Sequence, residues 1–310
     1  MAHKDGLKAY WDLDESSGNA IDSHTGGHDG TDNNTVGTSA TGGPGGGRCR
    51  DLVAANNEYF DVTHHADLTG GNSDWTIGGW GYSDDLSTTR SLMAKRTSSG
   101  GTDNEYEILW FDSKLQFFIG DGSTSFGTGI SHGGISTATW YFWLAWHNSG
   151  TSKLHLSEDD SEATAVSHGI TPGTSTAGVA LGNLFPTTPT LPWEGRMQFW
   201  GKWSQIVASG DRTSLYNSGS GVDYASLTGA SPSVLPWWYY AAQCRGMSPE
   251  DIEYEWAKFD KRRCELGAAR RRDTISFKER KRWVRDPKTG MFTPPVCGII
   301  TPRLFLGEVA

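Results

Sequence analysis

The chain has 310 residues with 40 Gly and 14 Trp, a length that allows one large β domain or two smaller domains. The aromatic content of 12% argues against a disordered chain. Residues 1–240 carry 12 basic and 26 acidic side chains, which argues against nucleic acid as the partner of this main part.

Alternating apolar residues predict short strands from residue 7 onward. LKAYWDL (7–13) places its apolar side chains on one face, whereas TWYFWLAWH (139–147) is apolar on both faces and is expected to be a central strand covered on both sides. Gly-rich turns such as GGPGGG separate the strands. We therefore predict about a dozen strands in a two-sheet antiparallel β-sandwich, with further strands in WTIGGWGY (75–82), EYEILW (105–110), LQFFIG (115–120) and LPWEGRMQFWGKW (191–203).

One short helix is expected within residues 209–219, after the strands. Ser209 or Asp211 would cap its start, and Leu215 and Tyr216 would dock it onto the sandwich. Residues 1–230 are therefore predicted to form one domain.

Residues 231–310 are predicted to form a basic, partly helical C-terminal extension, because residues 241–310 carry 15 basic and 10 acidic side chains. A helix is expected over about 249–266, where Ile252, Trp256 and Phe259 form an apolar stripe. Arg271 belongs to a basic cluster that follows. The extension is either a solvated helix with a loose tail, or a docking arm that drives self-association by contacting the acidic part of another copy.

Neither a signal peptide nor a membrane span is expected, because the N-terminus lacks an apolar stretch and no apolar run approaches about 20 residues. The four cysteines, none in CxxC spacing, leave three disulfide pairings open: Cys49, Cys244, Cys264 and Cys297.

Four segments in order resemble the laminin-G-like, concanavalin A-like lectin–glucanase superfamily of jelly-roll domains, over about residues 7–225. They are LKAYWDLDESSGNAIDSHTGGHDGT, NNEYFDVTHHADLTGGNSDWTIGGWGY, TWYFWLAWHNSGTSKLHL and EGRMQFWGKWSQIVASGDRTSLYNSG. The resemblance implies a jelly-roll sandwich, but this fold hosts lectins, adhesion modules, virion proteins and glycosidases.

The resemblance also implies a structural Ca²⁺ site in the loop after the first strand, with Asp22, the Gly27 carbonyl and Asp29 as ligands. Met197 and Gln198 stand where relatives often carry an Asp pair, so a hydrogen-bonded turn is the alternative.

Two further groups in the sequence have ordinary structural interpretations. His24 and His28 are interpreted as solvated turn residues, and Glu105 and Glu107 as a solvated strand face. EDDSE (158–162) has the acid spacing of the superfamily's glucanases but polar residues between the acids, which predicts an exposed hairpin turn rather than a catalytic centre.

The aromatic surplus favours sugar stacking, for which the expected residues are Tyr82, Trp143, His147 and Trp193. The leading functional hypothesis is a non-catalytic module that binds carbohydrate or another surface ligand, at an extracellular or virion surface. The alternatives are a structural component of a virion or similar assembly and, third, a glycoside hydrolase.

Overall fold

The computed structural model describes residues 3–24, 27–97, 103–228, 284–285 and 292–293. The chain divides into two units, Met1–Pro232 and Ser233–Ala310. In the second unit, β17 (Val284–Arg285) pairs with β18 (Phe292–Thr293) in an antiparallel arrangement. The helix expected over 249–266 lies outside the described residues, as do the predicted interaction residues Ile252, Trp256, Phe259 and Arg271.

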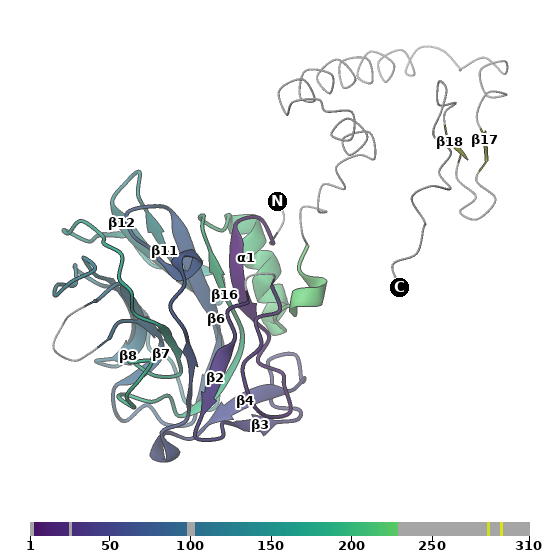
Figure 1. Cartoon of the computed structure of the whole chain (residues 1–310), viewed down its shortest axis with the longest axis horizontal. Helices are drawn as coiled ribbons and strands as arrows, with labels where there is room; N and C mark the ends of the chain where they lie inside the picture. Colours follow the sequence, from purple (N-terminus) through teal and green to yellow (C-terminus); the bar gives the residue numbers. More distant parts are fainter. Residues whose placement is uncertain (1–2, 25–26, 98–102, 229–283, 286–291, 294–310) are drawn as a thin grey trace, which may run out of the picture. The chain divides into compact units, whose positions relative to one another are not determined.

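The first unit is a sandwich of two antiparallel sheets, as the alternating sequence pattern predicts (Figure 1). The larger sheet has nine strands in the order β13-β12-β11-β6-β16-β4-β3, with β1 added beside β16 and β14 beside β12. Its strands are β1 (Leu7–Trp11), β3 (Gly37–Ser39), β4 (Cys49–Leu52), β6 (Trp75–Ser83), β11 (Trp140–Asn148), β12 (Lys153–Glu158), β13 (Ser161–Glu162), β14 (Val166–Ser167) and β16 (Gly195–Trp203).

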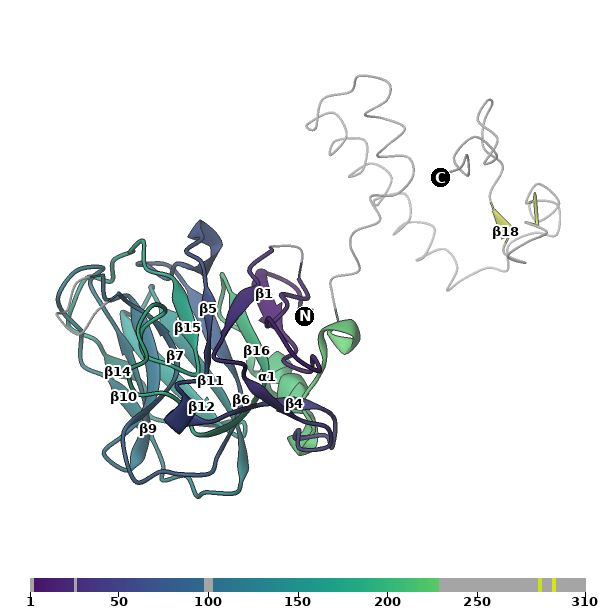
Figure 2. The same cartoon turned by 60° about the horizontal axis from the view of Figure 1, so that its bottom comes forward.

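The second sheet has seven strands in the order β10-β9-β8-β7-β15-β5-β2 (Figure 2). They are β2 (Gly30–Asn33), β5 (Tyr59–Val62), β7 (Arg90–Lys95), β8 (Tyr106–Phe111), β9 (Lys114–Ile119), β10 (Ile130–His132) and β15 (Val179–Leu181). Two 3₁₀ turns flank β5, namely η1 (Ala54–Asn56) and η2 (Ala66–Leu68). No helix among the described residues has the length and apolar character needed to cross a membrane.

The main core lies between the two sheets and is continuous from one to the other. The larger sheet contributes Trp75, Trp143 and Trp200, and the second sheet contributes Phe60 and Phe117. The glycines of β6 make room for the tryptophans, because a Cβ at Gly81 would overlap the ring of Trp143 and one at Gly79 would overlap the ring of Trp200. The composition of WTIGGWGY therefore follows from the packing of large rings over a central strand.

The outer face of the larger sheet is partly covered by α1 (Ser209–Tyr216), followed by the 3₁₀ turns η3 (Asn217–Gly219) and η4 (Tyr224–Ser226). Leu215 is buried, and the Tyr216 ring stacks on Trp80 at a centroid distance of 5.7 Å. The prediction that residues 139–147 form a central strand covered on both faces is thus confirmed.

The cap predicted for this helix is wrong. Ala208 is the N-cap residue, and no side chain caps the first turn. The helix ends at Tyr216, and the C-cap residue Asn217 adopts a left-handed conformation and donates its backbone N–H to Thr213 O. Asparagine tolerates this conformation better than most residues, so it takes the terminating role that glycine often has.

Candidate ligand-binding pocket

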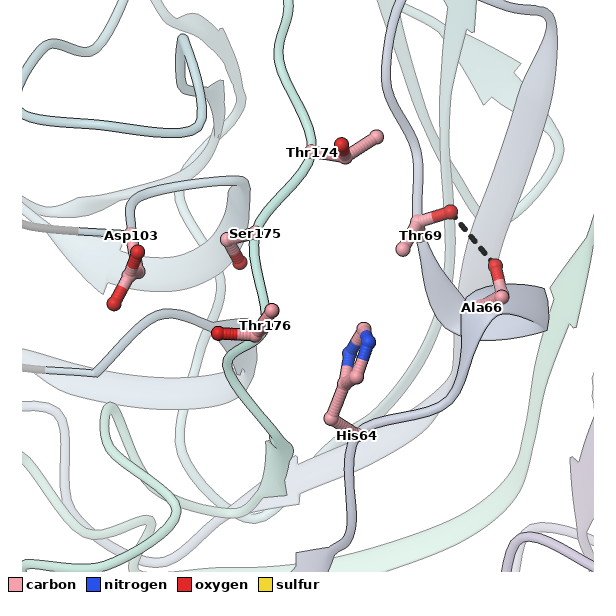
Figure 3. Close-up of a pocket in the computed structure, with 7 residues that line it drawn as sticks. All are labelled: His64, Ala66, Thr69, Asp103, Thr174, Ser175 and Thr176. Atoms are coloured by element: carbon pink, nitrogen blue, oxygen red, sulfur yellow. Dashed lines mark hydrogen bonds between the residues drawn. The ribbon is translucent and has the colours of Figure 1, made fainter.

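A polar pocket of about 420 Å³ opens at one end of the second sheet (Figure 3). Its walls come from the connection after β5, the residue Asp103 ahead of β8, and the segment ahead of β15. These segments meet because the four strands β5, β15, β7 and β8 are neighbours in the sheet. The last residues of β5 and β7 lie beside the first residues of β15 and β8, at the same end of the sheet. The lining residues are His64, Ala66, Thr69, Asp103, Thr174, Ser175 and Thr176.

The pocket is rich in hydrogen-bonding groups. The Thr174 and Thr176 side chains are exposed, and the His64 ring points between the 174–176 segment and η2 (Figure 3). Thr69 Oγ1 donates a hydrogen bond to Ala66 O at 2.7 Å, which fixes that wall. The lining residues offer hydroxyl, imidazole and carboxylate groups and include no Phe, Tyr or Trp, which suits a ligand that is held through hydrogen bonds.

A buried ion pair lies behind the pocket. Lys95 Nζ lies 3.2 Å from Glu105 Oε2, and it also donates to Ser175 O at 3.1 Å and Ala177 O at 2.5 Å. His64 Nδ1 lies 3.2 Å from the same ammonium. Burial lowers the pKa of Lys95, and the Glu105 carboxylate opposes that shift.

The Glu105 carboxylate links the same loops from the other side. Its Oε1 accepts the backbone N–H of Gly70, and its Oε2 accepts the backbone N–H and the hydroxyl of Ser175 at 3.0 and 3.1 Å. The pair therefore ties the connection after β5 to the segment ahead of β15, so both pocket walls are held in place before a ligand arrives.

Glycoside hydrolysis ordinarily needs two carboxylates, and the described lining residues of the pocket include one. Asp103 is the one carboxylate among its lining residues, and it accepts a hydrogen bond from Thr97 Oγ1 at 3.0 Å. Glu105 is 2% exposed, and its oxygens already accept the bonds described above. The arrangement offers hydrogen-bonding groups that can bind a polar ligand.

Three of the four residues predicted to stack on a sugar are misassigned, because they are buried. Trp143, His147 and Trp193 each have 0% exposure. The Trp143 and Trp193 rings meet edge to face at 6.4 Å, and Trp193 Nε1 donates to Tyr82 O at 3.2 Å. The rings belong to the core between the sheets and have no face left for a ligand.

Both ring nitrogens of His147 contact other residues of the protein. Its Nδ1 lies 2.7 Å from Ser73 O, and its Nε2 lies 3.3 Å from His168 Nε2. Burial lowers the pKa of His147, so the neutral imidazole is favoured in this setting.

Tyr82, the fourth residue, stays half-buried on the outer face of the larger sheet. Its ring lies 5.6 Å from that of Trp140, and the Arg196 guanidinium lies 4.6 Å from its centroid. Trp140 is also half-buried and donates Nε1 to Gly42 O at 2.8 Å. Tyr82, Trp140 and Arg196 form an outer aromatic patch, distinct from the pocket.

The loop predicted to hold Ca²⁺ is organised around hydrogen bonds to Asp22. Asp22 Oδ1 accepts the backbone N–H groups of Tyr10 and His24 at 2.9 and 3.0 Å, and Oδ2 accepts that of His28 at 3.1 Å. Asp29 Oδ1 accepts the backbone N–H of Asp22 at 2.8 Å. This donor arrangement does not fit Ca²⁺, because a cation at Asp22 would have to displace N–H groups from both oxygens. The hydrogen-bonded turn is the arrangement observed.

Of the other interpretations of charged residues, one is confirmed and two are wrong. The EDDSE hairpin is confirmed, since Asp159 and Asp160 form the turn between β12 and β13. The interpretation of Glu105 and Glu107 as a solvated face is wrong, because they are 2% and 7% exposed. The solvated placement of His28 is also wrong, since its ring is buried beside Asp22.

Neither Lys95 nor the lining threonines were among the site residues expected from the sequence. One signal was available for Lys95. It ends the apolar segment RSLMAK, and Glu105 immediately precedes the next strand, so pairing of the two strands brings the two residues together. The threonines lie in loops whose meeting depends on strand order, which local spacing does not encode.

Fold and pocket together define an all-β sandwich domain with a preformed polar pocket at one sheet end. No protein-family model matches the chain, and a search of curated proteins finds no match. Solved structures do share the fold. The binding domain of Paraclostridial Mosquitocidal Protein 1 has a TM-score of 0.56 at 13% identity, over 70% of this chain and 53% of that one.

Two other solved structures are similar at this level. Domain 4 of AbnA, an extracellular arabinanase from Geobacillus stearothermophilus solved with arabinotriose, has a TM-score of 0.51 at 16% identity, over 67% of this chain and 97% of that domain. The botulinum neurotoxin serotype D binding domain has a TM-score of 0.52 at 9% identity, over 70% of this chain and 52% of that domain. The chain thus spans about half the length of each of the two toxin domains.

Proposed function

We propose that the first unit is a non-catalytic carbohydrate-binding module and that the pocket at the end of the second sheet holds the sugar. The observation that carries this proposal is the pocket itself. It has about 420 Å³ of space, exposed threonine hydroxyls, and walls joined by the Lys95–Glu105 pair. A volume of this size lies within the range of about 300–1,000 Å³ typical of small-molecule sites.

A sugar ligand suits these residues because its hydroxyl groups both donate and accept hydrogen bonds. The Thr174 and Thr176 hydroxyls can do the same, whereas the Asp103 carboxylate accepts. Walls held by buried interactions lower the entropic cost of ordering the site on binding. The module's similarity in fold to an arabinanase domain solved with arabinotriose supports a saccharide as the ligand class.

The proposal is tested by a glycan array that includes arabinotriose, followed by calorimetry of the best ligand. Thr174→Ala and Thr176→Ala remove exposed hydroxyls from the pocket, so each should weaken binding by about tenfold, with the melting temperature unchanged. Thr151→Ala, an exposed threonine in the turn between β11 and β12, is the matched control and should bind as the wild type does.

Trp140→Ala separates the pocket from the outer aromatic patch. It should leave sugar binding intact, because Trp140 lies on the outer face of the other sheet. If Trp140→Ala abolishes binding and the two threonine variants do not, the pocket is the wrong site. If no glycan binds, the carbohydrate function is wrong.

A further inference from the structure

His28 has one ring nitrogen engaged and one without a partner. Nδ1 lies 3.0 Å from Asp22 Oδ2, so it carries the proton and donates it to that carboxylate. Nε2 is then an acceptor, and it is buried with no hydrogen-bond partner. A buried acceptor without a partner is costly, so binding of a cation or a hydrogen-bond donor to this nitrogen would be favourable.

Two further metal-binding side chains lie close to the His28 ring. The rings of His28 and His65 lie 4.6 Å apart between centroids, and one ligand atom from each of His28, His65 and Asp67 lies within 4.8 Å of the others. The His65 and Asp67 side chains are 53% and 38% exposed, so an ion can reach the cluster from solvent. His28 comes from the loop after β1, whereas His65 and Asp67 flank the start of η2.

Two imidazoles and one carboxylate form a ligand set that suits Zn²⁺, which keeps water as its fourth ligand where three protein groups bind. The Asp22 carboxylate fixes the His28 ring with Nε2 available, an arrangement common beside metal-bound histidines. Zn–N and Zn–O bonds of about 2.0–2.2 Å place ligand atoms roughly 3.4 Å apart. Rotation of the exposed His65 and Asp67 side chains can bring the ligand atoms from within 4.8 Å of one another to this shorter separation.

We propose that His28, His65 and Asp67 bind one Zn²⁺ ion, which joins the loop after β1 to the connection between β5 and β6. The site does not depend on the carbohydrate proposal, since none of its three ligands lines the pocket. One neighbouring charge opposes the ion. Lys8 Nζ lies 3.1 Å from Asp67 Oδ1, so the ammonium competes with the metal for this carboxylate.

The test uses the untagged full-length chain with Cys244, Cys264 and Cys297 replaced by serine, so that these thiolates bind no zinc. Calorimetry with ZnCl₂ should give one ion bound per chain. Co²⁺ should show the visible absorption of a four-coordinate site, and Zn²⁺ should raise the melting temperature until EDTA is added.

Within this background, His65→Ala should weaken Zn²⁺ binding at least tenfold and remove the melting shift. The His65 ring also caps η2 by accepting the Asp67 N–H, so the melting temperature of the variant without zinc is the control for folding. His24→Ala, a histidine of the same loop outside the cluster, is the matched control and should bind zinc normally. Lys8→Met should tighten binding severalfold, because it removes the competing cation. The proposal is overturned if the parent chain binds no stoichiometric zinc, or if His65→Ala binds zinc as tightly as the parent.

Discussion

Lys95 Nζ lies 3.2 Å from Glu105 Oε2, and both side chains are almost completely shielded from water, with exposures of 0% and 1%. The two residues are ten positions apart at facing ends of neighbouring strands, β7 and β8. Buried pairs of this kind add little net stability compared with apolar residues, but loss of one partner leaves an uncompensated charge. The pair therefore makes the pocket walls sensitive to single substitutions.

We expect Lys95→Met to destabilise the first unit by about 3–5 kcal/mol, because the Glu105 carboxylate would stay buried without its cation. Urea denaturation followed by tryptophan fluorescence measures the change. Lys153→Met, which alters an exposed lysine at the start of β12, should cost less than about 0.5 kcal/mol. Equal stability of Lys95→Met and the wild type would show that the pair does not hold the walls.

Lys202 provides a prediction about pH. It is fully buried over the Trp75 ring at 4.4 Å, and burial lowers the pKa of its ammonium to about 7. The unfolded chain, with a pKa near 10.5, binds more protons between pH 7 and pH 10.5, so this residue's contribution makes stability rise with pH across that window.

Lys202→Met should therefore be more stable than the wild type near pH 7, by at most about 5 kcal/mol, and this advantage should shrink towards pH 10. Denaturation curves for both proteins at several pH values measure the difference in free energy of unfolding. Titration of the other groups affects both proteins equally and cancels in this difference. A difference in stability that is independent of pH would refute the assignment.

Cys49 should be unreactive in the folded protein. It is buried and forms no disulfide within the described residues, and burial raises its pKa to about 11, so little thiolate forms at pH 8. Alkylation followed by peptide mass spectrometry should label Cys49 only after denaturant is added. Labelling at the same rate with and without denaturant would contradict its burial.

Trp143 and Trp140 give a matched test of core against surface. Trp143 is fully buried, so Trp143→Ala should lower the free energy of unfolding by about 3–5 kcal/mol. Trp140 is half-buried, and Trp140→Ala should cost clearly less. A small effect of Trp143→Ala, joined with a loss of sugar binding, would instead support the surface role that the sequence suggested.

The sequence by itself determined the class of fold. Alternation of apolar residues is a local property of a strand, so LKAYWDL predicted a strand with one buried face and TWYFWLAWH a strand buried on both. The structure has them as β1 and β11, with α1 covering the outer face near Trp80. The single buried face expected for LKAYWDL is wrong, because a register shift between Leu7 and Ala9 separates them: Leu7 and Tyr10 pack in the outer cluster, whereas Ala9 and Trp11 pack between the sheets. The EDDSE turn was also readable, because Asp159 and Asp160 favour turn conformations and separate two short paired strands.

Only the tertiary structure decided which residues fill the core and which line the pocket. A tryptophan contributes the same apolar signal whether it fills a core, as Trp143 does, or borders solvent, as Trp140 does. The pocket joins Thr69 to Thr174, and the proposed zinc site joins His28 to His65. Such contacts depend on the order of the strands and on how the two sheets stack. Packing across the whole core determines both, and the spacing of residues along the chain does not encode them.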